Sequence, residues 1–182
     1  MKLSSEELGK RYATALYDFA SERNLVSDIK SELATLQEVL QSNQSFLATF
    51  SNPALNLDQK RSFIRALENH FSQEMQNFLQ LLFDYQRMQS LPDVIEAYNK
   101  IYDARHRIAH GEVISATKMS AEQLTQLAAA YAKMNDLERF ELENSVDESL
   151  LGGVILKTDG KVIDGSIRTK IATLRSNLVN NI

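Results

Sequence analysis

The residues of this sequence that could do chemistry are a pair of adjacent glycines, two histidines and a few serines. Gly152-Gly153 could cradle a phosphate, but no Lys-Ser or Lys-Thr pair follows at the spacing of a P-loop. No further glycine completes a dinucleotide-binding fingerprint. We therefore interpret these glycines as residues that allow a bulge or a close approach of the backbone.

Two histidines stand four positions apart, a spacing that would place both on one face of a helix. His106 and His110 could then bind a metal, but no glutamate base lies between them, and Gly111 argues against a helix that continues past them. The chain has no cysteine, which excludes disulfides, zinc-thiolate sites, iron-sulfur clusters and thiolate nucleophiles. The sequence thus predicts no metal site and no cofactor.

Nucleophilic catalysis has little support in the sequence. Ser149 and Ser166 have no histidine near them in the chain, and only the distant His70 could act as their base. The carboxylates are scattered, so no pair is placed for acid-base work. We predict a protein that is not an enzyme. A small hydrolase that uses Ser149 or His70 is kept as an alternative, ranked below two binding functions that are described at the end of this section.

Composition describes a chain that can bury a core but has no general attraction for nucleic acid. Its 182 residues are 43% apolar, and 20 basic against 24 acidic residues give a net charge of −4. No apolar run approaches the ~18 residues of a membrane-spanning helix, and the first ten residues lack a secretory signal. We expect no nucleic-acid partner and no direct membrane insertion, so that any membrane association goes through another protein.

Apolar residues recur at helical spacing through residues 1–107. The pattern begins with Leu8, Tyr12, Leu16 and Phe19, and predicts a helix there. Further helices are expected over 29–40, 46–50, 57–67 and 73–88, and from Pro92 onward. Six helices with short connections predict a compact bundle as the N-terminal domain.

Glycine content and hydropathy period both change near residue 108. A strand is predicted over 112–117, then a helix opened by a Ser120-Gln123 capping box, then a strand over 139–146 with period-two alternation. A hairpin over 153–163 and a last helix follow. The core line of that helix is Ile167, Ile171, Leu174 and Leu178, and Asp164 could cap it. The pattern over 108–182 therefore predicts a small α+β domain, in a chain that is mainly α.

Two of the expected helices carry more apolar surface than one buried stripe needs. Between Met75 and Met88, eight of fourteen positions are apolar, and the first helix has small residues beside its apolar line. Both helices could be central in the bundle, or they could form a groove for an amphipathic helix of a partner. Periodicity alone leaves both interpretations open.

Several motifs resemble the delta subunit of F-type ATP synthases, called the oligomycin sensitivity-conferring protein in mitochondria. The opening helix has the family's Tyr-Ala-x-Ala-Leu at 12–16, and Arg87-Met88 followed by Leu91-Pro92 is similar to a second segment. Ile114-Ser115-Ala116 with Met119-Ser120 is similar to a third. The longest matching block runs over 146–155 and continues at 162–167.

This resemblance implies a stator component that joins the catalytic hexamer to the peripheral stalk, so that rotor torque drives ATP synthesis. The N-terminal domain would hold the amino-terminal helix of an alpha subunit, and the C-terminal domain would bind the C-terminal helices of the b-type stalk subunits. The groove for the alpha helix would be formed by Tyr12, Ala15, Leu16 and Phe19 opposite Phe78, Leu79 and Leu82. Aspartate in place of Leu82 or Phe19 is then expected to weaken binding without unfolding the domain.

Four residues of the matching motifs are expected to shape the fold rather than to touch a partner: Arg87, Gly152, Gly153 and Asp164. The resemblance places the protein peripherally on the cytoplasmic face of a bacterial plasma membrane or on the stromal face of a plastid thylakoid. The alternative function is another helical adaptor or regulatory binding module. Co-purification with catalytic alpha and beta subunits would distinguish the two.

Overall fold

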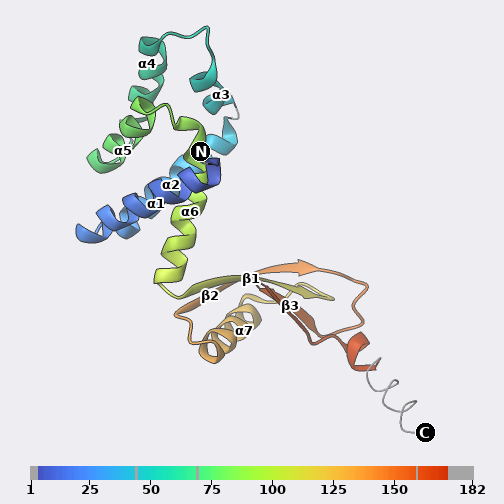
Figure 1. Ribbon diagram of the computed structural model, residues 1–182. Helices are drawn as coiled ribbons and strands as arrows, with labels where there is room; N and C mark the ends of the chain where they lie inside the picture. Colours follow the sequence, from blue (N-terminus) through green and yellow to red (C-terminus); the bar gives the residue numbers. More distant parts are fainter. Residues whose placement is uncertain (1–3, 44, 69, 159, 172–182) are drawn as a thin grey trace. The chain divides into compact units, whose positions relative to one another are not determined.

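The computed structural model describes residues 4–43, 45–68, 70–158 and 160–171 (Figure 1). The chain divides into two compact units, the first ending at Tyr102 and the second beginning at Asp103. The division lies within the last turns of a helix, a few residues before the boundary at 107 that the sequence suggested. We describe each unit by itself.

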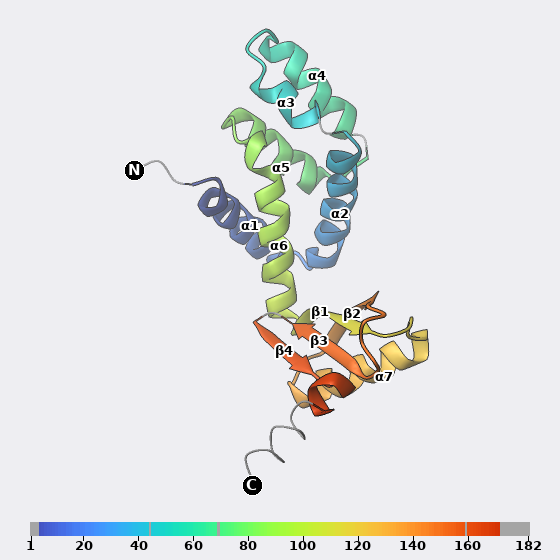
Figure 2. The same ribbon diagram turned by 90° about the vertical axis from the view of Figure 1, so that its right-hand side faces the viewer.

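In the described residues of the first unit the regular structure is helical, and Figure 2 shows these helices from a second side. Besides α-helices it contains one short 3-10 helix, η1, which the periodicity did not separate from its neighbours. The helices are α1 (Ser5–Glu22), α2 (Val26–Ser42), α3 (Ser45–Ser51), α4 (Leu57–Glu68), α5 (Gln73–Asp84), η1 (Met88–Ser90) and α6 (Leu91–Arg105).

Helix α5 ends at Asp84, four residues before the expected end at Met88. Gln86 takes a left-handed conformation with φ of 56°. The backbone N–H of Gln86 donates to the carbonyl of Phe83, and that of Arg87 donates to the carbonyl of Leu82 over 2.7 Å. These two bonds are the Schellman pattern that terminates helices. Arg87 thus takes part in this turn through its backbone, while its side chain is exposed.

One apolar core holds the first unit together. Tyr98 is fully buried on α6, and its hydroxyl donates to the carbonyl of Val26 over 3.0 Å. Gly9 brings α1 close to α6, because a Cβ at this position would lie 2.8 Å from the carbonyl carbon of Asp93. The small residues of the first helix therefore serve packing within the unit.

In its described residues, the second unit is a four-stranded sheet with one long helix against one face. Strand order is β2-β1-β3-β4, with β1 and β2 parallel and the other pairs antiparallel. Val113 and Phe140 bury their side chains under α7, where Tyr131 stacks on Phe140 at 4.2 Å between ring centroids. The elements are β1 (Ile108–Ser115), α7 (Ala121–Met134), β2 (Arg139–Val146), β3 (Val154–Thr158) and β4 (Lys161–Asp164).

The local signals of the second unit have mixed outcomes. The Ser120-Gln123 capping box is confirmed at the start of α7, and β2 spans the alternating segment as predicted. The first strand begins at Ile108 and ends at Ser115, so it is earlier than the expected 112–117. Residues 167–171 are helical, whereas Leu174 and Leu178 of the expected core line lie outside the described residues.

Gly152-Gly153 and Asp164 build the junction between β3, β4 and the helix at 167–171. Ser166, and not Asp164, caps that helix, since its hydroxyl accepts the N–H of Thr169 over 3.2 Å. Asp164 stabilises the turn that precedes the helix. Its carboxylate accepts the N–H of Ser166 over 2.8 Å and the hydroxyl of Thr169 over 2.6 Å. A Cβ at Gly153, where φ is 80°, would clash with the carbonyl oxygen of Gly165. The glycines therefore permit a close backbone approach, and they form no phosphate loop.

Replacing Gly153 by alanine is expected to destabilise the second unit by about 2–4 kcal/mol, because strain at positive φ adds to a backbone clash. Gly160→Ala is the matched control, since its φ is 78° but nothing lies within 4 Å of an added Cβ. It should cost only about 1 kcal/mol. Urea unfolding of the two variants measures the difference, and equal losses of stability would contradict the packing argument.

Acid is expected to loosen the same junction. Hydrogen bonds from the Thr169 hydroxyl, and then from Ser166, hold the pKa of Asp164 below its ordinary value of 3.8. A carboxylate whose pKa is lower in the folded state stabilises the fold above the unfolded pKa, and this contribution disappears as the pH falls through the folded pKa. Asp164→Asn should therefore lower stability at neutral pH and flatten its decline below pH ~4. Thermal unfolding across pH 2–7 tests this, and a decline as steep as in the parent chain would contradict it.

Candidate functional site

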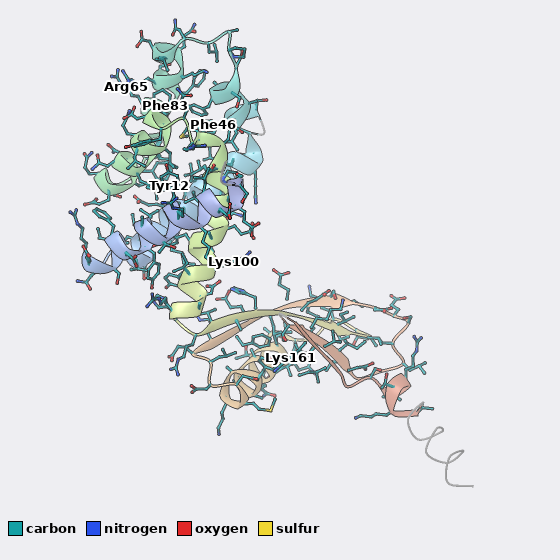
Figure 3. The ribbon with its side chains drawn as sticks, viewed as in Figure 1. Tyr12, Phe46, Arg65, Phe83, Lys100 and Lys161 are labelled. Atoms are coloured by element: carbon teal, nitrogen blue, oxygen red, sulfur yellow. The ribbon has the colours of Figure 1, made fainter. Side chains whose placement is uncertain are left out.

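An apolar groove lies between α1 and α5 on the first unit. It has a volume of about 330 Å³ and is lined from α1 by Tyr12, Ala15, Leu16 and Phe19, and from α5 by Glu74, Asn77, Phe78 and Leu81. Tyr12 and Phe19 are half-buried and Ala15 is exposed, so the wall from α1 is open to solvent. Figure 3 shows Tyr12 on α1 in this part of the first unit.

Five of the seven residues that the sequence assigned to this groove line it, and two do not. Leu79 and Leu82 are fully buried in the core of the unit, where no partner can reach them. Leu81 takes their place and is 40% exposed. The assignment of Leu79 and Leu82 is therefore corrected to Leu81.

The rotation of α5 about its axis explains the correction. Adjacent helical residues point about 100° apart, so Leu81 and Leu82 cannot serve the same surface. Positions 75, 79 and 82 form one stripe, which enters the core, and positions 74, 77, 78 and 81 form the stripe of the groove. The polar residues Glu74 and Asn77 sit on the second stripe, which was the signal in the sequence that this stripe meets solvent.

Charge is confined to one end of the groove. A guanidinium nitrogen of Arg23 lies 3.7 Å from the carboxylate of Glu74, and the same guanidinium sits 4.2 Å above the ring of Phe19. Both distances suit an ion pair and a cation–π contact, respectively. The rest of the lining offers carbon atoms to a partner, a lining that suits the apolar face of an amphipathic helix.

His110 and Ser166, two of the candidates for chemistry in the sequence, are engaged in other contacts. His110 lies in β1, so it shares no helix face with His106, and its ring nitrogens lie 3.0 Å from Asp103 and 3.5 Å from Glu141. Within the described ranges no group of three or more histidine or acidic residues could hold a metal. The hydroxyl of Ser166 is engaged in capping a helix. In that same part of the chain, no helix combines the length and the apolar character that crossing a membrane requires.

Comparisons with known proteins agree over nearly the whole chain. A family model described as ATP synthase delta (OSCP) subunit matches residues 8–178. ATP synthase subunit delta of Lactobacillus johnsonii is 38% identical over 181 residues, which cover 100% of both chains. The same subunit of Lactobacillus delbrueckii subsp. bulgaricus is 39% identical over 178 residues, or 98% of this chain and 99% of the relative.

A solved structure has a similar fold. A chain in the Toxoplasma gondii mitochondrial ATP synthase hexamer superposes with a TM-score of 0.66 at 23% identity, covering 94% of this chain and 97% of that one. Together with the family match, this fold agrees with the helical unit and small sheet described above. The chain belongs to the ATP synthase delta (OSCP) subunit family and is a non-catalytic component of the synthase stator.

Proposed function

We propose that the groove between α1 and α5 binds the amino-terminal helix of an ATP synthase alpha subunit and thereby attaches the catalytic hexamer to the stator. The observation that carries this proposal is an open apolar groove above a core that is already closed. Leu79 and Leu82 fill the core beneath it, while Phe19 and Leu81 remain accessible from outside. Surface apolar area of this kind, rimmed by polar residues, is typical of protein interaction sites.

Size and chemistry both suit a helix as the occupant. A volume of about 330 Å³ takes a few large apolar side chains, as an amphipathic helix presents at positions i, i+3, i+4 and i+7. Full burial of each such side chain contributes about 1.5–3 kcal/mol. Two or three central anchors therefore account for a tight contact even if the flanking contacts contribute little.

For the second unit we propose the C-terminal helices of the b-type stalk subunits as the partner. An apolar patch surrounds the start of the terminal helix and consists of Leu151, Ile167 and Ile171, all exposed. Ile167 lies beside Gly152, the residue that follows Leu151, because the N–H of Ile167 donates to the carbonyl of Gly152 over 3.0 Å. Such a patch offers a stalk helix apolar contact area next to a rigid backbone junction.

The mechanism that follows is mechanical. Ion flow turns the central rotor, and the catalytic hexamer must be held against that torque for ATP synthesis to be coupled to it. In this proposal the first unit holds the hexamer and the second unit holds the stalk, so affinity at the two sites is the functional output. The complex would sit on the cytoplasmic face of a bacterial plasma membrane, which the bacterial relatives favour over a plastid thylakoid.

Leu81→Asp is expected to weaken binding of a synthetic peptide from the N-terminal helix of an alpha subunit by about 2 kcal/mol or more, a roughly 30-fold loss of affinity. The charge would stand in the apolar floor of the occupied groove but remain solvated in the free protein. Isothermal titration calorimetry measures the affinity, and circular dichroism checks that the variant stays folded.

Two further variants control this experiment. Phe63→Asp alters a side chain of similar exposure, 45%, on α4 and outside the groove, and should leave the affinity unchanged. Leu82→Asp places a charge in the closed core and should unfold the domain, contrary to the expectation from sequence. The groove assignment would be contradicted by a folded Leu81→Asp variant that binds the peptide as tightly as the parent.

Leu151→Asp is expected to lower affinity for a fragment that contains the C-terminal helix of a b-type stalk protein by about tenfold, since it removes an apolar contact and introduces a charge. Leu151 is 75% exposed, and Met134→Asp on α7, at 74%, is the matched control. Fluorescence titration with the labelled fragment compares the two. Equal affinities for the two variants would remove the patch from the proposed stalk site.

A further inference from the structure

A second hollow lies in the first unit, between α3, α4 and the turn after α5. Its volume is about 390 Å³. Its lining consists of Phe50, Ser51, Leu57, Lys60, Phe83, Gln86, Met88 and Gln89. None of these residues lines the groove between α1 and α5, so the two hollows are separate surfaces of one unit.

The lining of this hollow is half apolar and half polar, and its two aromatic residues, Phe50 and Phe83, pack against each other. The ring of Phe50 packs edge-on against Phe46 at 5.1 Å and against Phe83 at 6.2 Å between centroids. Gln89 donates from its amide to the carbonyl of Leu47 and to the hydroxyl of Ser51, and so ties η1 to α3. The cavity therefore has a defined shape, and one apolar side chain at its rim, Leu57, is 66% exposed.

Charge is distributed unevenly around the hollow. No charged residue occurs between Val39 and Leu57, and η1 has none either, so the wall from α3 is neutral. Helix α4 supplies three cations: Arg61 and Arg65 lie one turn apart on the same face, and Lys60 points about 100° away from Arg61.

These cations have donors available for a ligand. The ammonium of Lys60 donates to the carbonyl of Phe50 over 2.9 Å, which uses one of its three N–H groups. The guanidinium carbon of Arg61 lies 5.9 Å from the centroid of the Phe83 ring, within reach of a cation–π contact. Arg65 is exposed one turn further on, and Figure 3 shows Arg65 on α4 and Phe83 on the neighbouring helix α5.

Two acidic residues flank the hollow without cancelling this charge. Asp58 stands in the first turn of α4, where it complements the helix dipole. The carboxylate of Asp84 accepts the side-chain amide of Gln80 over 2.9 Å. With Arg87 exposed at the turn, the cations of this region outnumber these two carboxylates.

We propose that this hollow is a second docking surface, which binds an acidic amphipathic segment of another protein of the synthase. Apolar side chains of the segment enter between Phe50, Leu57 and Phe83, and its carboxylates pair with Lys60, Arg61 and Arg65. Guanidinium groups bind carboxylates through two parallel hydrogen bonds, which makes this surface selective for acidic segments over neutral ones. This inference rests on the proposed function of the chain as a subunit of the synthase. It adds a contact with a partner that the groove between α1 and α5 does not provide.

Site-specific photo-crosslinking in the purified, assembled ATP synthase tests the proposal. Benzoylphenylalanine replaces Leu57 in one preparation and Ala15, in the α1–α5 groove, in another. Mass spectrometry then identifies the crosslinked peptide. We expect the probe at position 57 to crosslink to a segment that carries several aspartates or glutamates, and the probe at position 15 to report the proposed contact with the alpha helix separately.

Charge reversal supplies the decisive comparison. A triple variant carries Lys60→Glu, Arg61→Glu and Arg65→Glu. We expect its crosslinking yield from position 57 to be lower by about tenfold or more, because charge-assisted hydrogen bonds are lost. Arg65→Glu alone should lower it in part, and because Arg65 is exposed this single change leaves the fold intact. A matched triple reversal in the second unit, at exposed lysines, should change nothing: Lys118→Glu, Lys133→Glu and Lys161→Glu.

Three results would overturn the proposal: no crosslink from position 57, a crosslink to a neutral or basic segment, or a yield that is insensitive to the reversal at Arg65. If the crosslink from position 15 persists in these cases, the proposed function of the groove stands and only the second surface is lost. If position 57 crosslinks to an acidic segment while position 15 crosslinks to nothing, the second surface stands and the groove assignment fails.

Discussion

The account depends on one constraint: α5 has apolar side chains on more of its circumference than the core of its own unit covers. Leu79, Leu82 and the buried Phe78 belong to the core, and the exposed Leu81 continues the apolar surface around the helix beside the wall formed by α1. A helix that only stabilised its own bundle would carry a polar residue at an exposed position such as 81. Exposing this apolar surface to water is unfavourable in the free protein, but it provides a site that a partner helix can bury.

A stator protein needs this arrangement because its output is binding strength and not chemistry. The walls of the groove are set by features within the unit. Gly9 lets α1 approach α6, and the Schellman turn at Gln86 and Arg87 ends α5 before it can continue into η1. Since the walls are formed by helices that pack on a closed core, little conformational entropy should be lost when a partner binds.

The sequence predicted the helices and strands well wherever a local signal was strong. The capping box at Ser120 and the alternation over β2 are examples, because each is decided by residues a few positions apart. Prediction from the sequence was wrong where tertiary packing decides which face of a helix is buried or where the helix ends. The family resemblance implied Leu79 and Leu82 as groove residues, and periodicity could not correct this, because apolar residues surround so much of α5 that it does not say which stripe faces the core. The early end of α5 depends on a non-glycine residue at positive φ, for which glutamine gives no signal.

Solution NMR of the isotope-labelled chain, with methyl groups observed during titration by a peptide from the N-terminal helix of an alpha subunit, tests the central claim most directly. The account predicts that the largest shift changes occur at Ala15, Leu16 and Leu81, which line the groove, while those at Leu57 on α4 remain small. Changes centred on α3 and α4, or spread evenly over the first unit, would show that the partner helix binds elsewhere.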